Sequence, residues 1–214
     1  VIKLTADKPG SLSFNVRPQI AHLVPFGPLH RTDTMTIGYL SGPTQTRFSY
    51  NGREGKVFAK DDMITLRGKT EYLKLIYEAQ IKVIPVNGSI SARNDSNADH
   101  GTIRVENADS AVILLALGTN YHLSPQVFSG KPSEKLKGCP DPHAEISQRL
   151  TKAVQKGYAQ LRATHINDFS SLTERVQLSI GKKSPLPTDR LLAAYKQGKH
   201  DTYLEELFFH YGRY

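Results

Sequence analysis

The sequence predicts a mainly β fold, an antiparallel β-sandwich over residues 1–124 that is followed by an α-helical linker region. Two observations predict the sandwich: short apolar runs alternate with polar residues, and they are separated by tight turns such as Asn51-Gly52 rather than by helices. A third observation predicts the helices. From His143 onward, apolar residues recur every three or four positions, as they do on one face of a helix.

Eight segments of the first half are expected to be strands. The clearest is Glu71–Val86, where an apolar face alternates with a largely wet face that carries Glu78 and Gln80. The run Ala111–Leu117 is apolar on both faces, as expected of a strand between two packed layers. The polar stretch Asn87–His100 is expected to be an exposed loop, as is Pro18–Arg31. The predicted strands are Val1–Thr5, Ser11–Arg17, Thr34–Tyr39, Arg47–Tyr50, Met63–Leu66, Glu71–Val86, Thr102–Val105 and Ser110–Gly118.

The second half is expected to hold three segments: a connector loop over residues 125–141, a helical linker over 142–181, and the start of a further helical domain over 182–214. Gly157 interrupts the linker pattern, where it costs roughly 1 kcal/mol relative to alanine, so we expect a bend or two abutting helices. Val176–Ile180 alternates like a strand and is expected to return to the sandwich. The expected core anchors of the linker are Leu150, Leu161, Phe169 and Leu172.

The last segment opens at Pro187, where Thr188 or Asp189 can begin a new helix. A final amphipathic run, Tyr203–Tyr214, carries no stop signal, and we expect the fold to continue beyond it. Val1–Thr5 already resembles a strand, and no signal peptide is recognisable within this chain.

Composition narrows the class of protein. The 214 residues are 38% hydrophobic and 22% charged, as in globular proteins, and no apolar run approaches the roughly 18–20 residues that span a bilayer. The formal charge of +8 is dispersed along the chain, which does not favour a nucleic-acid partner. The single cysteine, Cys139, excludes an internal disulfide and a cysteine-built zinc site.

No residue of this chain is expected to be catalytic, cofactor-binding or metal-binding. His165 and Asp168 could share a helix face as metal ligands, but no third ligand is apparent. Glu205 and Glu206 are adjacent on one helix, so they point about 100° apart and cannot flank a sugar as glycosidase carboxyls do. Aromatic residues could form a sugar-stacking platform, although packing is the default expectation for them; these are Tyr72, Tyr77, Tyr121 and Phe128.

Several motifs resemble glycoside hydrolase family 95, the α-L-fucosidase-like enzymes. The most specific is His165–Gly181, and the sandwich contributes Val105–Ala111 and Thr119–Tyr121. The similarity covers most of residues 100–214, whereas over residues 1–100 it rests on strand pattern and the opening segment Leu4–Phe14. The remaining matching motifs are Gly157–Arg162, Leu186–Leu191 and Leu207–Tyr214.

The resemblance implies an architecture of a large β-sandwich, a helical linker and an (α/α)₆ barrel that carries the catalytic residues. Family members invert the anomeric centre, with a glutamic acid that protonates the leaving oxygen. The chain is expected to be a partial supersandwich plus a linker, and to support the barrel. No cofactor is expected. The oligosaccharide or glycan substrate is expected to bind only to the missing catalytic domain. A secreted or periplasmic location is implied, and neither nucleic acid nor membrane is an expected partner; the sequence does not indicate the oligomeric state.

Two other hypotheses remain open. The chain could be a free-standing carbohydrate-binding module whose exposed loops and tyrosines hold sugar without cleaving it. It could also be a polyanion-binding protein, which would require binding that weakens steeply with salt.

Overall fold

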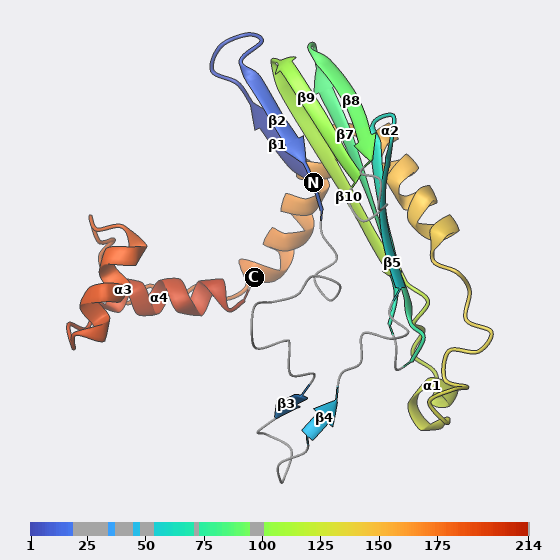
Figure 1. Cartoon of the computed structure of the whole chain (residues 1–214). Helices are drawn as coiled ribbons and strands as arrows, with labels where there is room; N and C mark the ends of the chain where they lie inside the picture. The colour runs from blue at the N-terminus through green and yellow to red at the C-terminus, as the bar shows by residue number, and fades with distance from the viewer. Residues whose placement is uncertain (19–33, 37–44, 48–53, 71–72, 95–100, 214) are drawn as a thin grey trace. The chain divides into compact units, whose positions relative to one another are not determined.

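The computed structural model describes residues 1–18, 34–36, 45–47, 54–70, 73–94 and 101–213. The chain divides into two compact units, Val1–Tyr158 and Ala159–Tyr214, which are described separately. Figure 1 shows the strands in the first unit and helices α3 and α4 in the second.

All strands of the described residues belong to the first unit, and every pairing between them is antiparallel. Five strands form one sheet, in the order β1-β10-β7-β6-β5, and three form a second, in the order β2-β9-β8. The pair β3–β4 stands as a separate two-stranded sheet. The strands are β1 (Ile2–Thr5), β2 (Leu12–Val16), β3 (Thr34–Thr36), β4 (Gln45–Arg47), β5 (Glu54–Lys60), β6 (Met63–Lys69), β7 (Ile76–Val86), β8 (Ser89–Asn94), β9 (Gly101–Ala108) and β10 (Ser110–Thr119).

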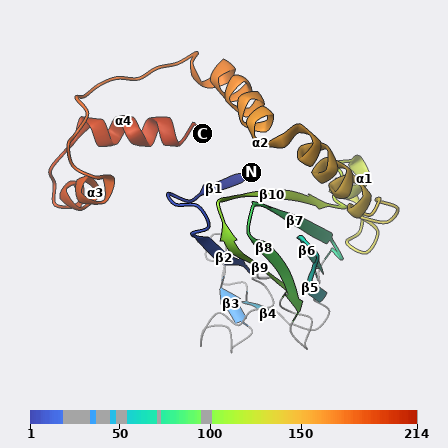
Figure 2. The same cartoon turned by 90° about the horizontal axis from the view of Figure 1, so that it is seen from above.

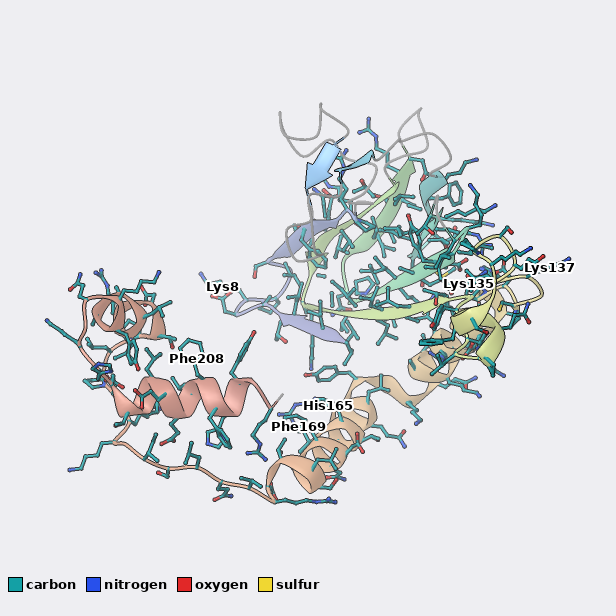
Figure 3. All side chains as sticks on the ribbon, turned by 90° about the horizontal axis from the view of Figure 1, so that it is seen from below. Lys8, Lys135, Lys137, His165, Phe169 and Phe208 are labelled. Carbon is teal, nitrogen blue, oxygen red and sulfur yellow. The ribbon has the colours of Figure 1, made fainter. Side chains whose placement is uncertain are left out.

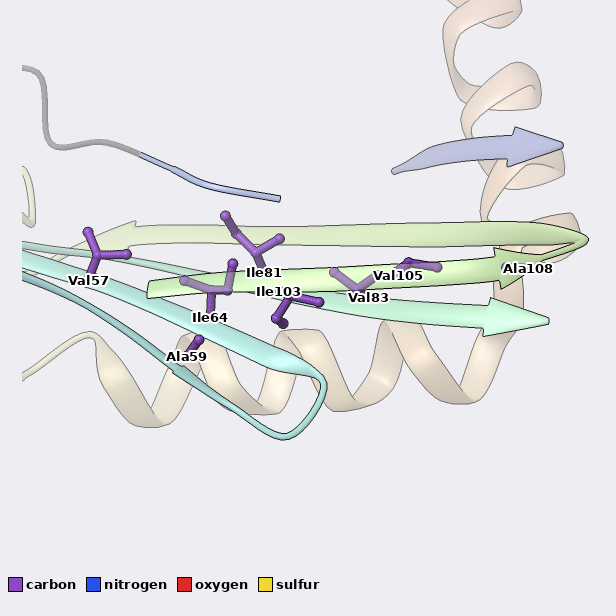
Figure 4. Packing of buried hydrophobic residues seen from close by; sticks show 8 residues of the cluster. All are labelled: Val57, Ala59, Ile64, Ile81, Val83, Ile103, Val105 and Ala108. Carbon is purple, nitrogen blue, oxygen red and sulfur yellow. The ribbon is translucent and has the colours of Figure 1, made fainter. Parts of the chain in front are cut away.

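The five-stranded and three-stranded sheets pack face to face, so the predicted sandwich is confirmed (Figure 2). Strand β9 lies over β5, β6 and β7. The chain passes directly from one of these sheets to the other between β1 and β2, between β7 and β8, and between β9 and β10. Alternate residues of both sheets point into the space between them, which is the reason that the period-2 pattern of the sequence predicts this core. Figure 4 shows its centre, which is formed by Val57, Ala59, Ile64, Ile81, Val83, Ile103, Val105 and Ala108.

Two strands differ from the sequence-based expectation. Strand β5 was not predicted, and β8 occupies part of the predicted loop Asn87–His100, so that prediction is wrong for Ser89–Asn94. The reason is that Asn87 and Gly88, which both have positive φ (55° and 74°), form a tight turn from β7 in one sheet into β8 in the other, where β8 pairs with β9. Polar residues are tolerated in β8 because its side chains are exposed apart from half-buried Ile90.

The other strand predictions are confirmed where the structure describes them. Strands β1, β2, β6, β7, β9 and β10 fall on predicted segments. Strand β3 begins the predicted segment Thr34–Tyr39, and β4 overlaps Arg47–Tyr50 by one residue; the rest of both segments lies outside the described residues, as do residues 19–31 of the predicted loop.

The outer face of the five-stranded sheet is the main correction to the predicted burial. Glu78 and Gln80 of β7 are buried rather than wet, because the first half of α2 (His143–Thr173) lies over them. The helix approaches so closely that a Cβ added to Gly118 of β10 would stand 2.9 Å from the side chain of Ile146. The first unit therefore has three layers: the helix, the five-stranded sheet and the three-stranded sheet.

The helices begin close to their predicted positions. Helix α3 begins after Pro187 as expected. Helix α1, which Ser124 caps, was not predicted and occupies the start of the predicted connector loop 125–141. The predicted strand Val176–Ile180 does not form, because its backbone bonds to side chains of α4 instead of to a neighbouring strand. The helices are α1 (Pro125–Ser129), α2 (His143–Thr173), α3 (Thr188–Lys196) and α4 (Thr202–Tyr211).

The predicted core anchors of the linker are only partly confirmed. Leu150 is buried, together with Ile146 one turn earlier, and Leu161 and Phe169 are half-buried. Leu172 is 57% exposed, so its assignment as a core anchor is wrong for this chain. The apolar residues of α2 are therefore buried against the sheet in the first turns of the helix and become more exposed toward its end.

We expect Leu150→Ala to lower the free energy of unfolding by about 2–5 kcal/mol, because it removes a fully packed side chain and leaves a cavity. The matched control, Leu172→Ala, deletes the same atoms from an exposed site and should change it by less than about 0.5 kcal/mol. Urea unfolding followed by circular dichroism measures both; equal losses would contradict the packing described above.

Gly157 gives a second test, since it adopts φ 70° and ψ 164° and breaks α2 into two helices, as predicted. This backbone conformation is essentially restricted to glycine, so Gly157→Ala should destabilise the chain by roughly 1–3 kcal/mol. In a continuous helix the same substitution would stabilise by up to about 1 kcal/mol. The sign of the change in a thermal melt therefore distinguishes a broken helix from a straight one.

Candidate functional site

The described residues form one extended polar cluster, which lies between the five-stranded sheet and the start of α2. We name it the polar junction. Three members come from the sheet and three from the helix and the residues just before it, and all lie within the first unit. They are Arg67 of β6, Glu78 and Gln80 of β7, and Asp141, His143 and Ser147.

Glu78 is the centre of the polar junction. Its side chain has no exposed surface, and both carboxylate oxygens accept hydrogen bonds. Arg67 donates to Oε2 over 2.7 Å, while Gln80 and the Nδ1 of His143 donate to Oε1 over 2.8 and 2.7 Å. A buried carboxylate is tolerated only with such partners, and these come from the sheet and from the helix.

The first turn of α2 is held by the remaining bonds. The guanidinium of Arg67 bonds both oxygens of Asp141, and one of those oxygens accepts the backbone N–H of His143. Gln80, which already donates to Glu78, also donates to the hydroxyl of Ser147 over 2.8 Å. His143 and Ser147 of the helix therefore both have bonding partners on the sheet, and the polar junction fixes both the position and the rotation of the start of α2.

Electrostatics favour the charged forms of the acidic residues. Burial of Glu78 raises its pKa, but hydrogen bonds from Gln80, Arg67 and His143 and the charge of His143 outweigh burial and hold that pKa below its ordinary value. The hydrogen bond from Arg67 lowers the pKa of Asp141 to about 2. The same pairing with Asp141, opposed by burial, raises the pKa of Arg67.

This arrangement is suited to holding an element in place rather than to a reaction. A general acid needs a proton near neutral pH and an open path to substrate, whereas Glu78 is ionised, enclosed and already bonded by three donors. Among the described side chains, none of the buried nitrogen or oxygen atoms lacks a hydrogen-bond partner. The polar junction is therefore saturated with protein contacts.

Sequence reasoning missed the polar junction, although a signal was present. The run Ala111–Leu117 was predicted to be covered on both faces. Leu114 is buried, but Leu115 and Leu117 are 51% and 59% exposed, so that prediction is only partly right. Strand β10, which contains the run, pairs with β7. An element that covers one face of β10 also covers the same face of its neighbour β7. Polar residues on that face of β7 therefore needed hydrogen-bond partners from the covering helix.

The candidate metal ligands of the sequence are not brought together with others. His165 is exposed and stacks on Phe169, with ring centroids 6.0 Å apart. Within the described ranges no group of three or more histidine, cysteine, aspartate or glutamate residues is placed to hold a metal ion. Cys139, in the loop before α2, is half-buried and unpaired by a disulfide.

The adjacent carboxylates of α4 have separate structural partners in the second unit. Glu205 accepts a hydrogen bond from the hydroxyl of Tyr195 over 2.7 Å, and Glu206 accepts the backbone N–H of Ile180 over 3.0 Å. The pairing with Glu205 raises the pKa of Tyr195. The two carboxylates point to different neighbours, as their spacing predicted.

The aromatic candidates are divided between packing and exposure. Tyr77 is half-buried against the sandwich core, where its ring covers Gly68 on the neighbouring strand. Tyr121 is exposed, and Phe128 on α1 is 81% exposed. Tyr72 lies outside the described residues.

One groove is found in the described part of the second unit, with a volume of about 480 Å³. The end of α2 provides one wall and the end of α4 the other, and the surface between them is almost wholly apolar. Its lining contains a single carboxyl group, that of Glu174. The residues are Phe169, Thr173, Glu174, Val176, Gln177, His210, Tyr211 and Arg213.

Comparison with known proteins gives a consistent set of relatives. Residues 157–214 match the sequence profile described as "Glycosyl hydrolase family 95 catalytic domain". The protein named "Probable alpha-fucosidase A" from Aspergillus niger is 31% identical over 156 residues, which are 71% of this chain and 19% of that protein. "Alpha-L-fucosidase 2" from Arabidopsis thaliana is 26% identical over 233 aligned residues, which cover 100% of this chain and 24% of that protein. The chain thus spans about a fifth to a quarter of the length of these relatives.

The polar junction predicts an acid-sensitive fold. Because the pKa of Glu78 and that of Asp141 are lowered in the folded state, their contribution to stability is fully present above their ordinary values of 4.5 and 3.8 and is lost as pH falls toward about 2. Glu78→Gln keeps the shape but removes the titrating charge. Urea unfolding at several pH values between about 6 and 2.5 should show a shallower loss for this variant than for the wild type. The matched control is Glu174→Gln, which removes an exposed carboxyl outside the polar junction and should keep the wild-type slope.

Proposed function

Because this chain belongs to glycoside hydrolase family 95, the α-L-fucosidase-like family, we propose that it forms the non-catalytic N-terminal portion of a glycosidase and supports the catalytic domain. The whole protein would hydrolyse terminal α-L-fucosyl or related glycosidic bonds with inversion. Its partner would be an oligosaccharide or glycan, bound by a catalytic domain for which this chain provides the scaffold.

The path of α2 is the observation that carries this proposal. The first turn of the helix is bonded to the sandwich through Glu78, Gln80 and Arg67, and the helix then breaks at Gly157. The match to the family's catalytic domain begins at the same residue. A helix fixed to the sandwich therefore leads directly into the catalytic-domain region, which is the connection that a supporting domain requires.

The carboxyl groups of the chain support a non-catalytic role. Inverting glycosidases place two carboxyls roughly 6.5–9.5 Å apart across an open cleft. Glu78 is enclosed, Glu205 and Glu206 bond to their own neighbours, and the described groove presents only Glu174. The chemistry of the proposed glycosidase is thus assigned to residues other than these.

The proposed location of the whole protein is secreted or periplasmic, following the family resemblance. No helix in the described ranges is long and apolar enough to cross a membrane.

A second candidate function is a carbohydrate-binding module, and the exposed rings of Tyr121 and Phe128 favour it. Exposed aromatic rings on a loop and a short helix can stack on the apolar faces of sugars. The sandwich scaffold itself does not discriminate between the two candidates, because one fold hosts many functions.

The intact mass of the protein in its source organism tests the first proposal. A scaffold for a catalytic domain should be part of a product several times heavier than 23.8 kDa, because this chain covers about a fifth to a quarter of its relatives. The purified product should release fucose, or a related sugar, with inversion at the anomeric carbon. A product near 23.8 kDa would contradict the proposal.

Calorimetric titration with fucosylated glycans tests the second candidate. A binding module should give saturable heat that Phe128→Ala removes, whereas the matched variant Leu123→Ala, at a neighbouring exposed apolar position, should retain it. The scaffold hypothesis predicts no saturable heat from residues 1–214 with either variant.

A further inference from the structure

The short helix α1 presents one aromatic side chain outward in a fixed position. Val127 of this helix is buried, and its backbone N–H donates to the hydroxyl of Ser124 over 3.2 Å. Successive residues of a helix point about 100° apart, so the burial of Val127 turns the next side chain away from the protein. That side chain is Phe128, which is 81% exposed. Its exposure is therefore imposed by the way in which α1 is anchored.

The loop that follows α1 is fastened to the helix. The side-chain amide of Gln126 donates to the carbonyl of Glu134 over 3.1 Å, and the Nζ of Lys135 donates to the carbonyl of Phe128 over 3.3 Å. Within the loop, the carbonyl of Lys131 accepts the backbone N–H of Lys135 over 3.1 Å. These bonds hold the charged groups of the loop close to the exposed ring.

Positive charge is in excess in this part of the chain. Residues 122–140 contain three lysines and a single carboxylate, that of Glu134. The next acid along the chain, Asp141, is already paired with Arg67. Figure 3 shows Lys135 and Lys137 beside α1. We name Phe128 together with the three lysines the α1 surface; the lysines are Lys131, Lys135 and Lys137.

From these contacts we propose that the α1 surface binds an acidic polysaccharide of uronic acids, whose carboxylates contact the lysines while a sugar ring stacks on Phe128. The inference goes beyond the proposed function, because neither the scaffold role nor the binding of fucosylated glycans requires a charged polymer. A lysine ammonium is a point charge on a flexible stem and can follow a carboxylate on a mobile chain. An aromatic ring offers its face to the apolar face of a sugar.

Other occupants fit this surface less well. A lipid surface binds amphipathic helices through a stripe of several apolar side chains, whereas Leu123 and Phe128 are the only exposed large hydrophobic residues of the segment 122–140. An apolar protein partner would have to desolvate the lysines without neutralising them. Single-stranded nucleic acid is bound by successive stacking rings along a basic groove, and this surface offers one ring. A chain with one carboxylate on each sugar requires only a ring and spaced cations.

Affinity electrophoresis of the natural gene product, in gels that contain sodium polygalacturonate, tests the proposal. Phe128→Leu should weaken binding about three- to tenfold because it removes the stacking ring, whereas Phe128→Tyr keeps the ring and should stay within about twofold of the wild type. Lys131→Gln and Lys137→Gln should each weaken binding about two- to fivefold. The matched control, Lys8→Gln, removes the same charge from an exposed turn between β1 and β2 and should leave binding unchanged.

Two further polymers separate the contribution of the sugar from that of the charge. Methyl-esterified polygalacturonate keeps the sugar chain without its carboxylates, and polyglutamate keeps carboxylates without the sugar. The proposal expects weak binding of the esterified polymer, and binding of polyglutamate that Phe128→Leu leaves unchanged.

Three outcomes would overturn the α1 surface as a polysaccharide site. Equal losses from Lys8→Gln and from the lysine variants of the surface would show attraction by net charge alone. No loss from Phe128→Leu, or the same loss with polyglutamate, would show that no sugar stacks on the ring. Tighter binding of oligothymidylate, or of vesicles of phosphatidylcholine and phosphatidylserine, that depends on Phe128 would assign the surface to a different partner.

The intact mass separates failure of this inference from failure of the proposed function. A product several times heavier than 23.8 kDa that releases fucose, but in which the variants have no effect on polygalacturonate binding, overturns the α1 surface alone. A product near 23.8 kDa in which the variants have the expected effects overturns the scaffold role and supports the α1 surface.

Discussion

The buried carboxylate of Glu78 is the constraint on which the arrangement of the first unit depends. A charge enclosed between a sheet and a helix would be strongly destabilising by itself, so it must be bonded from both elements. Arg67 and Gln80 supply the bonds from the sheet, and His143 supplies the bond from the helix. Apolar contact alone would allow the helix to slide or rotate on the sheet, whereas these directional bonds select one register. The start of α2 is consequently fixed where the linker leaves the sandwich.

The two units differ in how completely they bury their apolar residues. In the first unit, two sheets and a helix enclose a core whose central residues, such as Ile64, Val83 and Ile103, have no exposed surface. In the second unit, buried positions are few, and aromatic residues of α4 remain open to solvent. That contrast supports the proposal that the first unit is a scaffold and the second unit belongs to a catalytic domain. It also explains why side-chain bonds to the backbone, from Glu206, His210 and Arg213, are prominent where apolar packing is sparse.

Local sequence rules succeeded at several elements, but the alternation of Val176–Ile180 did not produce a strand. Glycine's backbone freedom predicted the break at Gly157, and proline's fixed φ predicted the beginning of α3 after Pro187. Period-2 alternation predicted the long strand β7. The rules failed where a polar stretch was taken for a loop. Asn87-Gly88 forms the sharp turn from β7 into β8, but the polar residues around it indicated a loop, and β8 was missed for that reason.

The sequence by itself determined the class of fold, most of its strands and the family, because these depend on local periodicity and on specific short motifs such as His165–Gly181. It also indicated that the adjacent carboxyls of Glu205 and Glu206 are not spaced for glycoside hydrolysis. Only the tertiary structure decided which faces are covered. Glu78 and Gln80 resemble solvent-facing residues in sequence, and Leu172 resembles a core residue, yet their burial is the reverse. The physical reason is that burial depends on which distant segment lies over a face, and periodicity within one segment carries no information about that partner.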